Sequence, residues 1–214
     1  PVIALTAMLL VIVAIAYAPR NPLIYAVGIV FVVALLAALG PNDTLARAGE
    51  KLRLRTPKQA NVVYTDESQY SYIAGRTESD DDNLRVMQLD QLTHSQIDLR
   101  DPTHLLYEYE WIYSAVVEKN HPLPQPVRAF VIGGGGYAYP NYLVHARPDS
   151  KVVVAEIDPA VTEAAHIALG LPRDTPIIIN DMDARIVAVD FLHQAETDPD
   201  FAKFDYIFGD SIND

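Results

Sequence analysis

Residues 127–158, VRAFVIGGGGYAYPNYLVHARPDSKVVVAEID, decide the fold that we expect for this chain. An apolar run from Val127 to Ile132 leads into four glycines, and a second apolar run, Lys151 to Ile157, is followed by Asp158. Unbroken apolar runs are typical of parallel strands whose sheet is covered by helices on both faces, and glycines let a ligand approach the backbone closely. The stretch therefore predicts a strand, a glycine turn, a short helix and a second strand.

The acidic residue at the end of the second strand predicts a ligand that contains a nucleoside. Glu156 should face the crevice at the carboxyl edge of the sheet, where it can accept hydrogen bonds from a ribose diol. Asp158 precedes Pro159 and is more simply the cap of the next helix. The pattern GxGxxA that starts at Gly133 also fits a loose dinucleotide fingerprint. The glycines alone are therefore compatible with several classes of ligand, and also with a tight strand-to-helix turn that binds no ligand.

Strands and helices continue to alternate after Asp158. We expect a helix over 161–169, a strand over 177–179, a helix over 183–193 and a strand over 206–208. This alternation predicts a Rossmann-like, doubly wound parallel sheet over 121–214, in which ligands bind at the carboxyl ends of the strands. Glu156, Asp183 and Asp210 each follow such an end, so their carboxylates should converge on one site.

Residues 59–120 should form a small antiparallel sheet followed by a helix. Val, Ile and Tyr are frequent over 62–64, 69–74 and 84–89, and polar segments separate these runs. The aspartates at 80–82 indicate a solvated loop. Asp101 and Pro102 predict the start of a helix that runs to about Lys119. Apolar residues at helical spacing predict its buried face: Leu105, Leu106, Tyr109, Ile112, Tyr113 and Val116.

Two uncharged apolar stretches, residues 1–18 and 23–39, begin the chain. Each approaches the length that crosses a bilayer, and only residues 19–22 separate them. Basic residues over 47–58 follow, which by the positive-inside rule lie in the cytoplasm. We therefore expect a transmembrane helical hairpin over 1–40, a basic cytoplasmic linker over 41–58, membrane lipid as a partner and a multi-pass location in the inner membrane. A buried hairpin is the alternative.

Composition limits the remaining choices. The chain has 214 residues, no cysteine and a net charge of −12, which argues against nucleic acid and suits a cationic substrate. The six histidines, which have no ligand-like spacing, predict no metal site and are expected in surface or core roles: His94, His104, His121, His145, His166 and His193. The sequence starts at Pro1 and stops just after a predicted strand, so we expect a fragment whose sheet is truncated at the C-terminus.

Short motifs occur in a defined order from about Val62 to the end of the chain. They are Glu67-Ser68-Gln69-Tyr70 with Ile73, Leu89-Asp90, Tyr107–Glu110, Ile132–Gly136, Glu156-Ile157-Asp158, Asp183-Ala184-Arg185 and Asp210-Ser211 with Asp214. Together they resemble the spermidine synthase family, the polyamine aminopropyltransferases, and in particular its membrane-fused bacterial branch.

The resemblance implies a transferase that moves the aminopropyl group of decarboxylated S-adenosylmethionine, its co-substrate, to putrescine or a related amine and releases methylthioadenosine. The attacked carbon lies next to a sulfonium, a very good leaving group, so the protein must mainly hold a neutral amine in line with it. The family uses no metal, and the resemblance leaves a homodimer open.

The resemblance also implies roles for individual residues. Asp210 would orient the amine and accept its proton as the catalytic base. Tyr70 and Asp90 would line the amine side. The remaining residues would bind the nucleoside, with Glu156 at the ribose hydroxyls, Asp183 at the adenine amino group, and Gly133, Gly134, Gly135 and Gly136 as the backbone floor. Ile157 and Ala184 would be further residues of the same binding site.

One departure from the family concerns the donor. Its soluble enzymes follow the third glycine with an aspartate, which is expected to hold an amine end, whereas this chain has Gly136-Tyr137-Ala138. A methyltransferase that uses intact S-adenosylmethionine is therefore an alternative, and a cation near the glycines would favour it. An oxidoreductase with a nicotinamide cofactor and a nucleoside-sensing domain without catalysis are further alternatives.

Overall fold

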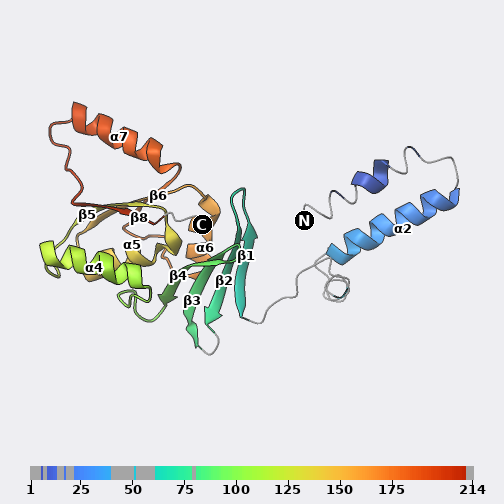
Figure 1. Ribbon diagram of the computed structural model, residues 1–214, viewed down its shortest axis with the longest axis horizontal. Helices are drawn as coiled ribbons and strands as arrows, with labels where there is room; N and C mark the ends of the chain where they lie inside the picture. The colour runs from blue at the N-terminus through green and yellow to red at the C-terminus, as the bar shows by residue number, and fades with distance from the viewer. Residues whose placement is uncertain are drawn as a thin grey trace. The chain divides into compact units, whose positions relative to one another are not determined.

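The computed structural model describes residues 6, 9–13, 17, 22–39, 51, 61–78 and 81–210. The chain divides into two compact units, Pro1–Gln59 and Ala60–Asp214, and each is described by itself. In the first unit, helix α2 spans Pro22–Leu39 (Figure 1). The predicted basic linker over 41–58, apart from Lys51, and the motif residues Ser211 and Asp214 lie outside the described residues. The predicted domain boundary at residue 120 stays a prediction.

The prediction of two transmembrane helices is wrong. No helix in the described part of the chain is both long and apolar enough to cross a membrane. Most of the predicted first span, residues 1–18, lies outside the described residues. The predicted multi-pass location in the inner membrane is wrong for the same reason, and membrane lipid loses its support as a partner.

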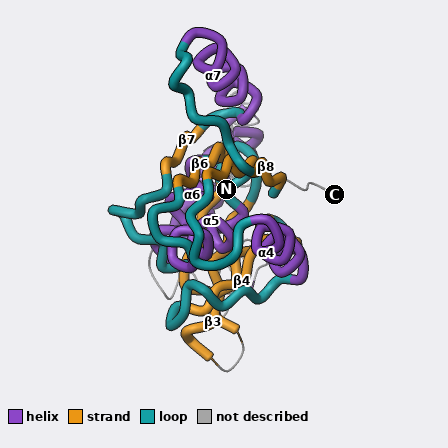
Figure 2. Tube along the Cα trace, turned by 90° about the vertical axis from the view of Figure 1, so that its left-hand side faces the viewer, coloured by secondary structure: helices purple, strands orange, loops and turns teal. Residues whose placement is uncertain are grey.

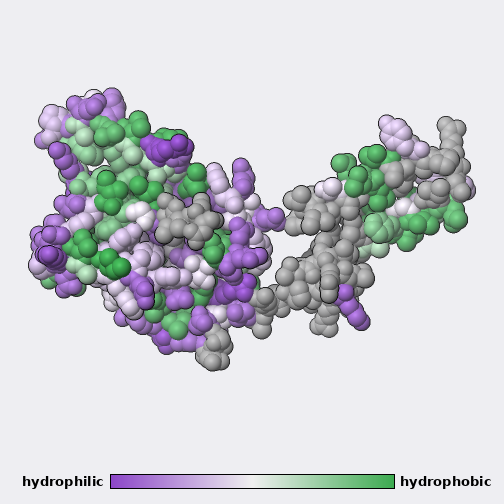
Figure 3. Space-filling view, viewed as in Figure 1, coloured by the Kyte–Doolittle hydropathy of each residue, from purple (hydrophilic) through white to green (hydrophobic). Residues whose placement is uncertain are grey.

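The alternative of a buried hairpin is not supported either. The side chains of Leu23, Val27 and Phe31 on α2 are exposed, and hydrophobic residues gather on the surface of this helix (Figure 3). The fold class is therefore corrected to an α/β fold with one antiparallel and one parallel sheet.

The second unit contains the parallel sheet that the sequence predicts. Its strands are β5 (Arg128–Ile132), β6 (Lys151–Glu156), β7 (Ile178–Asp181) and β8 (Tyr206–Gly209), in the order β7-β6-β5-β8. All neighbouring pairs are parallel. Because side chains alternate along a strand, β5 and β6 bury apolar residues on both faces of the sheet.

Helices cover both faces of this sheet. Helices α4 (Glu108–Asn120), α5 (Ala138–Ala146) and α6 (Pro159–Ala168) contribute to the larger core on one face. On the other face, Val187 of helix α7 (Ala184–Thr197) packs in a smaller cluster with Phe130. The parallel sheet lies between α7 and the antiparallel sheet (Figure 2). The sheet is therefore doubly wound.

The antiparallel sheet is a four-stranded meander. It consists of β1 (Val62–Glu67), β2 (Tyr72–Glu78), β3 (Asp81–Leu89) and β4 (Leu92–Asp98), paired in chain order. Strand β2 packs closely on α6, since a Cβ at Gly75 would come within 2.5 Å of the Ala168 Cβ. The predicted loop at the aspartates is partly wrong: β3 begins at Asp81, while Asp80 lies outside the described residues.

The predicted start of α4 is also wrong, and its predicted buried face is only partly correct. The helix begins at Glu108 rather than near Asp101. The Asp101 carboxylate accepts a hydrogen bond from the Thr103 backbone N–H at 2.8 Å, and such local bonds compete with helix formation. Ile112 and Val116 are exposed, whereas Glu110 is fully buried. Tyr113 packs against the core as predicted, so the apolar spacing identifies only part of the buried face.

Candidate active site

One cavity of about 570 Å³ opens where the carboxyl ends of β5, β6 and β8 face the β3–β4 hairpin. Its volume is in the range of cavities that bind small organic ligands. The cavity brings together most of the residues that the sequence singles out: Tyr70, Asp90, Gly133, Gly135, Glu156, Ile157, Asp183, Ala184 and Asp210. Gly134 and Gly136 do not line it.

Two backbone N–H groups fix the carboxylate of Glu156 at the cavity. Its Oε2 atom accepts a hydrogen bond from the Gly134 N–H at 2.6 Å, and its Oε1 atom accepts one from the Asp158 N–H at 2.9 Å. Burial raises the pKa of Glu156, while these two hydrogen bonds oppose the shift. Each carboxylate oxygen has a second lone pair, so Glu156 can still accept from hydroxyl groups in the cavity.

Gly134 also has a packing role in this arrangement. A Cβ at this position would lie 2.8 Å from the Tyr137 ring and 3.0 Å from the Glu156 Oε2 atom. The glycine therefore allows the backbone to approach the carboxylate that it binds, although it does not line the cavity itself.

Asp158 caps helix α6, as Pro159 after it predicts. One carboxylate oxygen accepts from the Ala160 N–H at 3.0 Å. The other accepts from the Ser68 hydroxyl, which in turn accepts from the backbone N–H of Tyr70 at 3.0 Å. These contacts fix the loop that carries Tyr70 to the end of β6, and so hold Tyr70 at the cavity.

Asp210 lies just past the end of β8 and packs on the glycine loop. Its backbone N–H donates to the Ile132 carbonyl at 2.7 Å, and its Oδ2 atom accepts from the Tyr109 hydroxyl at 3.2 Å. A Cβ at Gly135, which has a φ of +49°, would overlap the Asp210 carboxylate. Burial raises the pKa of Asp210 to about 6, and the hydrogen bond from Tyr109 opposes the shift. Such a carboxylate is a stronger base than an ordinary aspartate.

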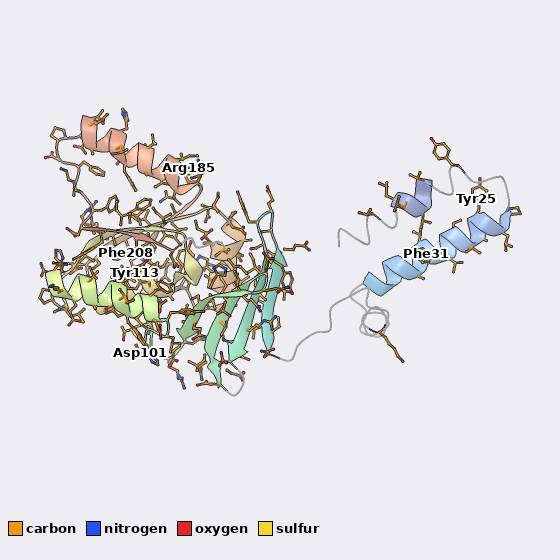
Figure 4. The ribbon with its side chains drawn as sticks, viewed as in Figure 1. Tyr25, Phe31, Asp101, Tyr113, Arg185 and Phe208 are labelled. Atoms are coloured by element: carbon orange, nitrogen blue, oxygen red, sulfur yellow. The ribbon has the colours of Figure 1, made fainter. Side chains whose placement is uncertain are left out.

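Helix α4 supplies the groups that support Asp210. Tyr109 and Tyr113 are one turn apart, and the Tyr113 hydroxyl donates to the Gly209 carbonyl at 2.7 Å. The Tyr113 ring packs on Phe208 with 4.9 Å between ring centroids (Figure 4). Burial raises the pKa of Glu110, the residue after Tyr109, to about 7. The apolar spacing of α4 assigned Tyr109 to the core and did not predict its contact with Asp210.

Asp183 both lines the cavity and caps α7. Its carboxylate accepts from the Arg185 backbone N–H at 2.8 Å and pairs with the Arg185 guanidinium at 2.6 Å. The hydrogen bonds from Arg185 lower the pKa of Asp183 to about 2. The carboxylate is therefore charged throughout the neutral range, and its predicted contact with adenine stays a prediction.

The charge of the cavity suits a cation. Its lining includes five carboxyl side chains, those of Asp90, Glu156, Asp158, Asp183 and Asp210, against the guanidinium of Arg185. Clefts lined by one sign of charge attract ligands of the opposite sign. The site therefore favours an amine over a phosphate-rich ligand.

The structure gives a reason for the departure at Gly136. This residue has a φ of +72°, and a Cβ on it would lie 2.7 Å from the Ser95 Cβ and 3.0 Å from the Leu169 Cδ1. A side chain does not fit there unless these neighbours move. The aspartate that the resemblance leads us to expect here, for the amine end of the donor, therefore has no counterpart at this position.

Comparison with known proteins addresses the fold. No protein-family model and no curated protein matches the chain. Among solved structures, it is similar to a probable spermidine synthase from Corynebacterium glutamicum, with 26% identity over 62% of this chain and 47% of that chain and a TM-score of 0.52. It is also similar to the spermidine synthase from Thermotoga maritima, with 23% identity over 73% and 49% and a TM-score of 0.50.

The fold is shared with spermidine synthases. The chain spans about half the length of these two structures. The predicted resemblance is thus confirmed for the fold, and the similarity supports a transferase. The membrane-fused branch is not supported.

Proposed function

We propose that this chain transfers the aminopropyl group of decarboxylated S-adenosylmethionine to putrescine or a related amine and releases methylthioadenosine. The observation that carries the proposal is the convergence of Glu156, Asp183 and Asp210 on one acidic cavity, in a fold shared with spermidine synthases. Three carboxylates at strand ends suit two substrates together: a donor that has a ribose and an adenine amino group, and an acceptor that has an attacking amine.

The nucleoside half of the donor is assigned to the side of the cavity formed by β6 and α7. Glu156, oriented by the Gly134 N–H, would accept from the ribose hydroxyls. Ile157 and Ala184 provide apolar surface for the adenine, and Asp183 would accept from its amino group. The Gly133 and Gly135 backbone would form the floor.

Asp210 is assigned the proton transfer. The acceptor amine carries a proton at neutral pH and cannot attack until it loses that proton. With a pKa of about 6, Asp210 is mostly ionised at pH 7 and yet basic enough to take the proton. The amine nitrogen then forms a bond to the carbon next to the sulfonium, and the electron pair of the broken C–S bond stays on the sulfur of methylthioadenosine. Tyr70 and Asp90 would hold the distant end of the amine.

A methyltransferase is the second candidate, because the closed space around Gly136 excludes a carboxylate at the position where the resemblance expects one to hold the amine end of the donor. The methionine carboxylate of intact S-adenosylmethionine calls for a cation. Arg185 lines the cavity, but its guanidinium is already paired with Asp183. The charge of the cavity therefore favours aminopropyl transfer.

Methylthioadenosine release from decarboxylated S-adenosylmethionine, measured with and without putrescine or spermidine, tests the proposal. Intact S-adenosylmethionine is the control for the donor. Asp210→Asn should abolish release, while Asp200→Asn, an exposed residue after α7, should leave it unchanged. Binding of the intact donor without release would contradict the proposal and favour a methyltransferase or a nucleoside sensor.

A further inference from the structure

Strand β4 has an irregular residue beside the cavity. Met87 of β3 pairs with Ser95 and Gln88 pairs with Thr93, so His94 has no partner on β3. Such a bulge places an extra residue in one strand and redirects its side chain. As a result His94 lines the cavity, while the adjacent Ser95 is fully buried.

The imidazole of His94 is available to a ligand. Its side chain is half-buried, and within the described residues no protein group hydrogen-bonds to the ring. Burial lowers the pKa of His94, and the nearby Asp90 opposes the shift. The imidazole is therefore mostly neutral at neutral pH, and a neutral imidazole has one nitrogen that can accept a hydrogen bond.

We propose that His94 is an additional amine-binding residue, whose neutral ring accepts a hydrogen bond from a protonated amino group and whose protonation repels that group. The proposal rests on the proposed function, because it assigns His94 to the amine side that Tyr70 and Asp90 already define. A binding residue of this kind makes the affinity for the amine depend on pH.

Other titratable or charged groups face the same space. The 68–71 loop contributes Tyr70, the end of β6 contributes Glu156 and Asp158, and the end of β8 contributes Asp210. The start of α7 adds the Asp183–Arg185 pair.

Among these groups, Asp210 has a pKa of about 6 and also gains a proton on acidification. A fall in affinity at low pH is therefore insufficient by itself. The test must report on the His94 ring directly.

The direct test is the pKa of His94, measured by NMR titration of the histidine-labelled chain with saturating methylthioadenosine, with and without putrescine. The resonance is assigned by its absence in His94→Gln. Since the amine binds the neutral ring, saturating putrescine should lower the pKa of His94 by about half a unit or more, because coupling between two binding events is reciprocal. The exposed His193 of α7 should not shift.

Binding measurements on variants provide the second readout. His94→Gln keeps an acceptor that does not titrate, so its dissociation constant for putrescine should stay within about threefold of wild type at pH 7.5 and rise less at pH 5.5. His94→Phe loses the acceptor and should weaken binding about tenfold at pH 7.5. His193→Gln, the matched control, should bind like wild type at both pH values.

Two results would overturn the assignment in different ways. If putrescine binds but the pKa of His94 is unchanged or rises, His94 does not contact the amine, and the proposed function stands. If putrescine does not bind to the wild-type chain at either pH, the proposed function fails and this inference fails with it.

Discussion

Replacing Tyr109 with Phe should shift the acid limb of the pH–rate profile to higher pH. The Tyr109 hydroxyl donates to the Asp210 carboxylate at 3.2 Å, and burial keeps this hydroxyl protonated because it raises the pKa of Tyr109. The hydrogen bond stabilises the ionised form of Asp210, so its loss raises the pKa of the base. Removal of a hydrogen bond of about 1 kcal/mol corresponds to a little less than one pKa unit.

The magnitude follows from the starting value. With a pKa of about 6 for Asp210, half of the wild-type chains carry the active carboxylate at pH 6. If the pKa rises by about 0.7 unit, kcat/KM at pH 6 falls about threefold, whereas at pH 8.5 it stays within about twofold because Asp210 is then ionised in both proteins. The assay is methylthioadenosine release between pH 5.5 and 9.

Tyr113→Phe is the matched control. It removes a hydroxyl from the same face of α4, but that hydroxyl donates to the Gly209 carbonyl and not to the carboxylate. Its profile should keep the wild-type acid limb. An unchanged limb in Tyr109→Phe, or a limb that moves to lower pH, would refute the role assigned to the Tyr109–Asp210 contact.

Three further predictions concern packing, loop position and buried charge. Gly75→Ala should lower the free energy of unfolding by about 1–3 kcal/mol in denaturant titrations, because its Cβ would meet Ala168; unchanged stability would contradict the close packing of β2 on α6. Ser68→Ala should raise the KM for the amine severalfold with little change in kcat, because the loop of Tyr70 loses its link to Asp158; Ser68→Thr should restore it, and a change in kcat alone would count against this role. The pKa of Glu110 is raised by burial to about 7, so the folded state prefers the protonated form, and wild-type stability should fall by up to about 3 kcal/mol between pH 5 and 8. Glu110→Gln should make that dependence shallower, with the remainder due to Asp210, whose pKa burial also raises; an equally steep fall in the variant would exclude Glu110 as a cause.

The parallel sheet and the carboxylates at its strand ends could be predicted from the sequence. Strands β5 and β6 are buried on both faces, so their apolar runs are uninterrupted and easily recognised. The carboxyl ends of parallel strands meet at one edge, which is why Glu156, Asp183 and Asp210 share one cavity.

Other features depend on contacts between distant residues and could not be predicted. Strand β4 contains His94 and Gln96 and lacks the apolar alternation of a typical strand. The bulge that turns His94 into the cavity is set by its register with β3. Tyr109 and Asp210 are 101 residues apart in the sequence, and helical spacing alone cannot reveal their hydrogen bond.

The membrane prediction failed for a different reason. Apolar composition fits several helical environments and does not by itself decide between them, and no helix in the described part of the chain is long and apolar enough to cross a membrane.

The mass of the amine product tests the central claim most directly. After incubation of the full chain with decarboxylated S-adenosylmethionine and putrescine, mass spectrometry should detect putrescine that has gained one aminopropyl group, in amounts equal to the methylthioadenosine released. The Asp210→Asn variant should yield neither product. A methylated product from intact S-adenosylmethionine, with no aminopropylated amine from the decarboxylated donor, would contradict the account.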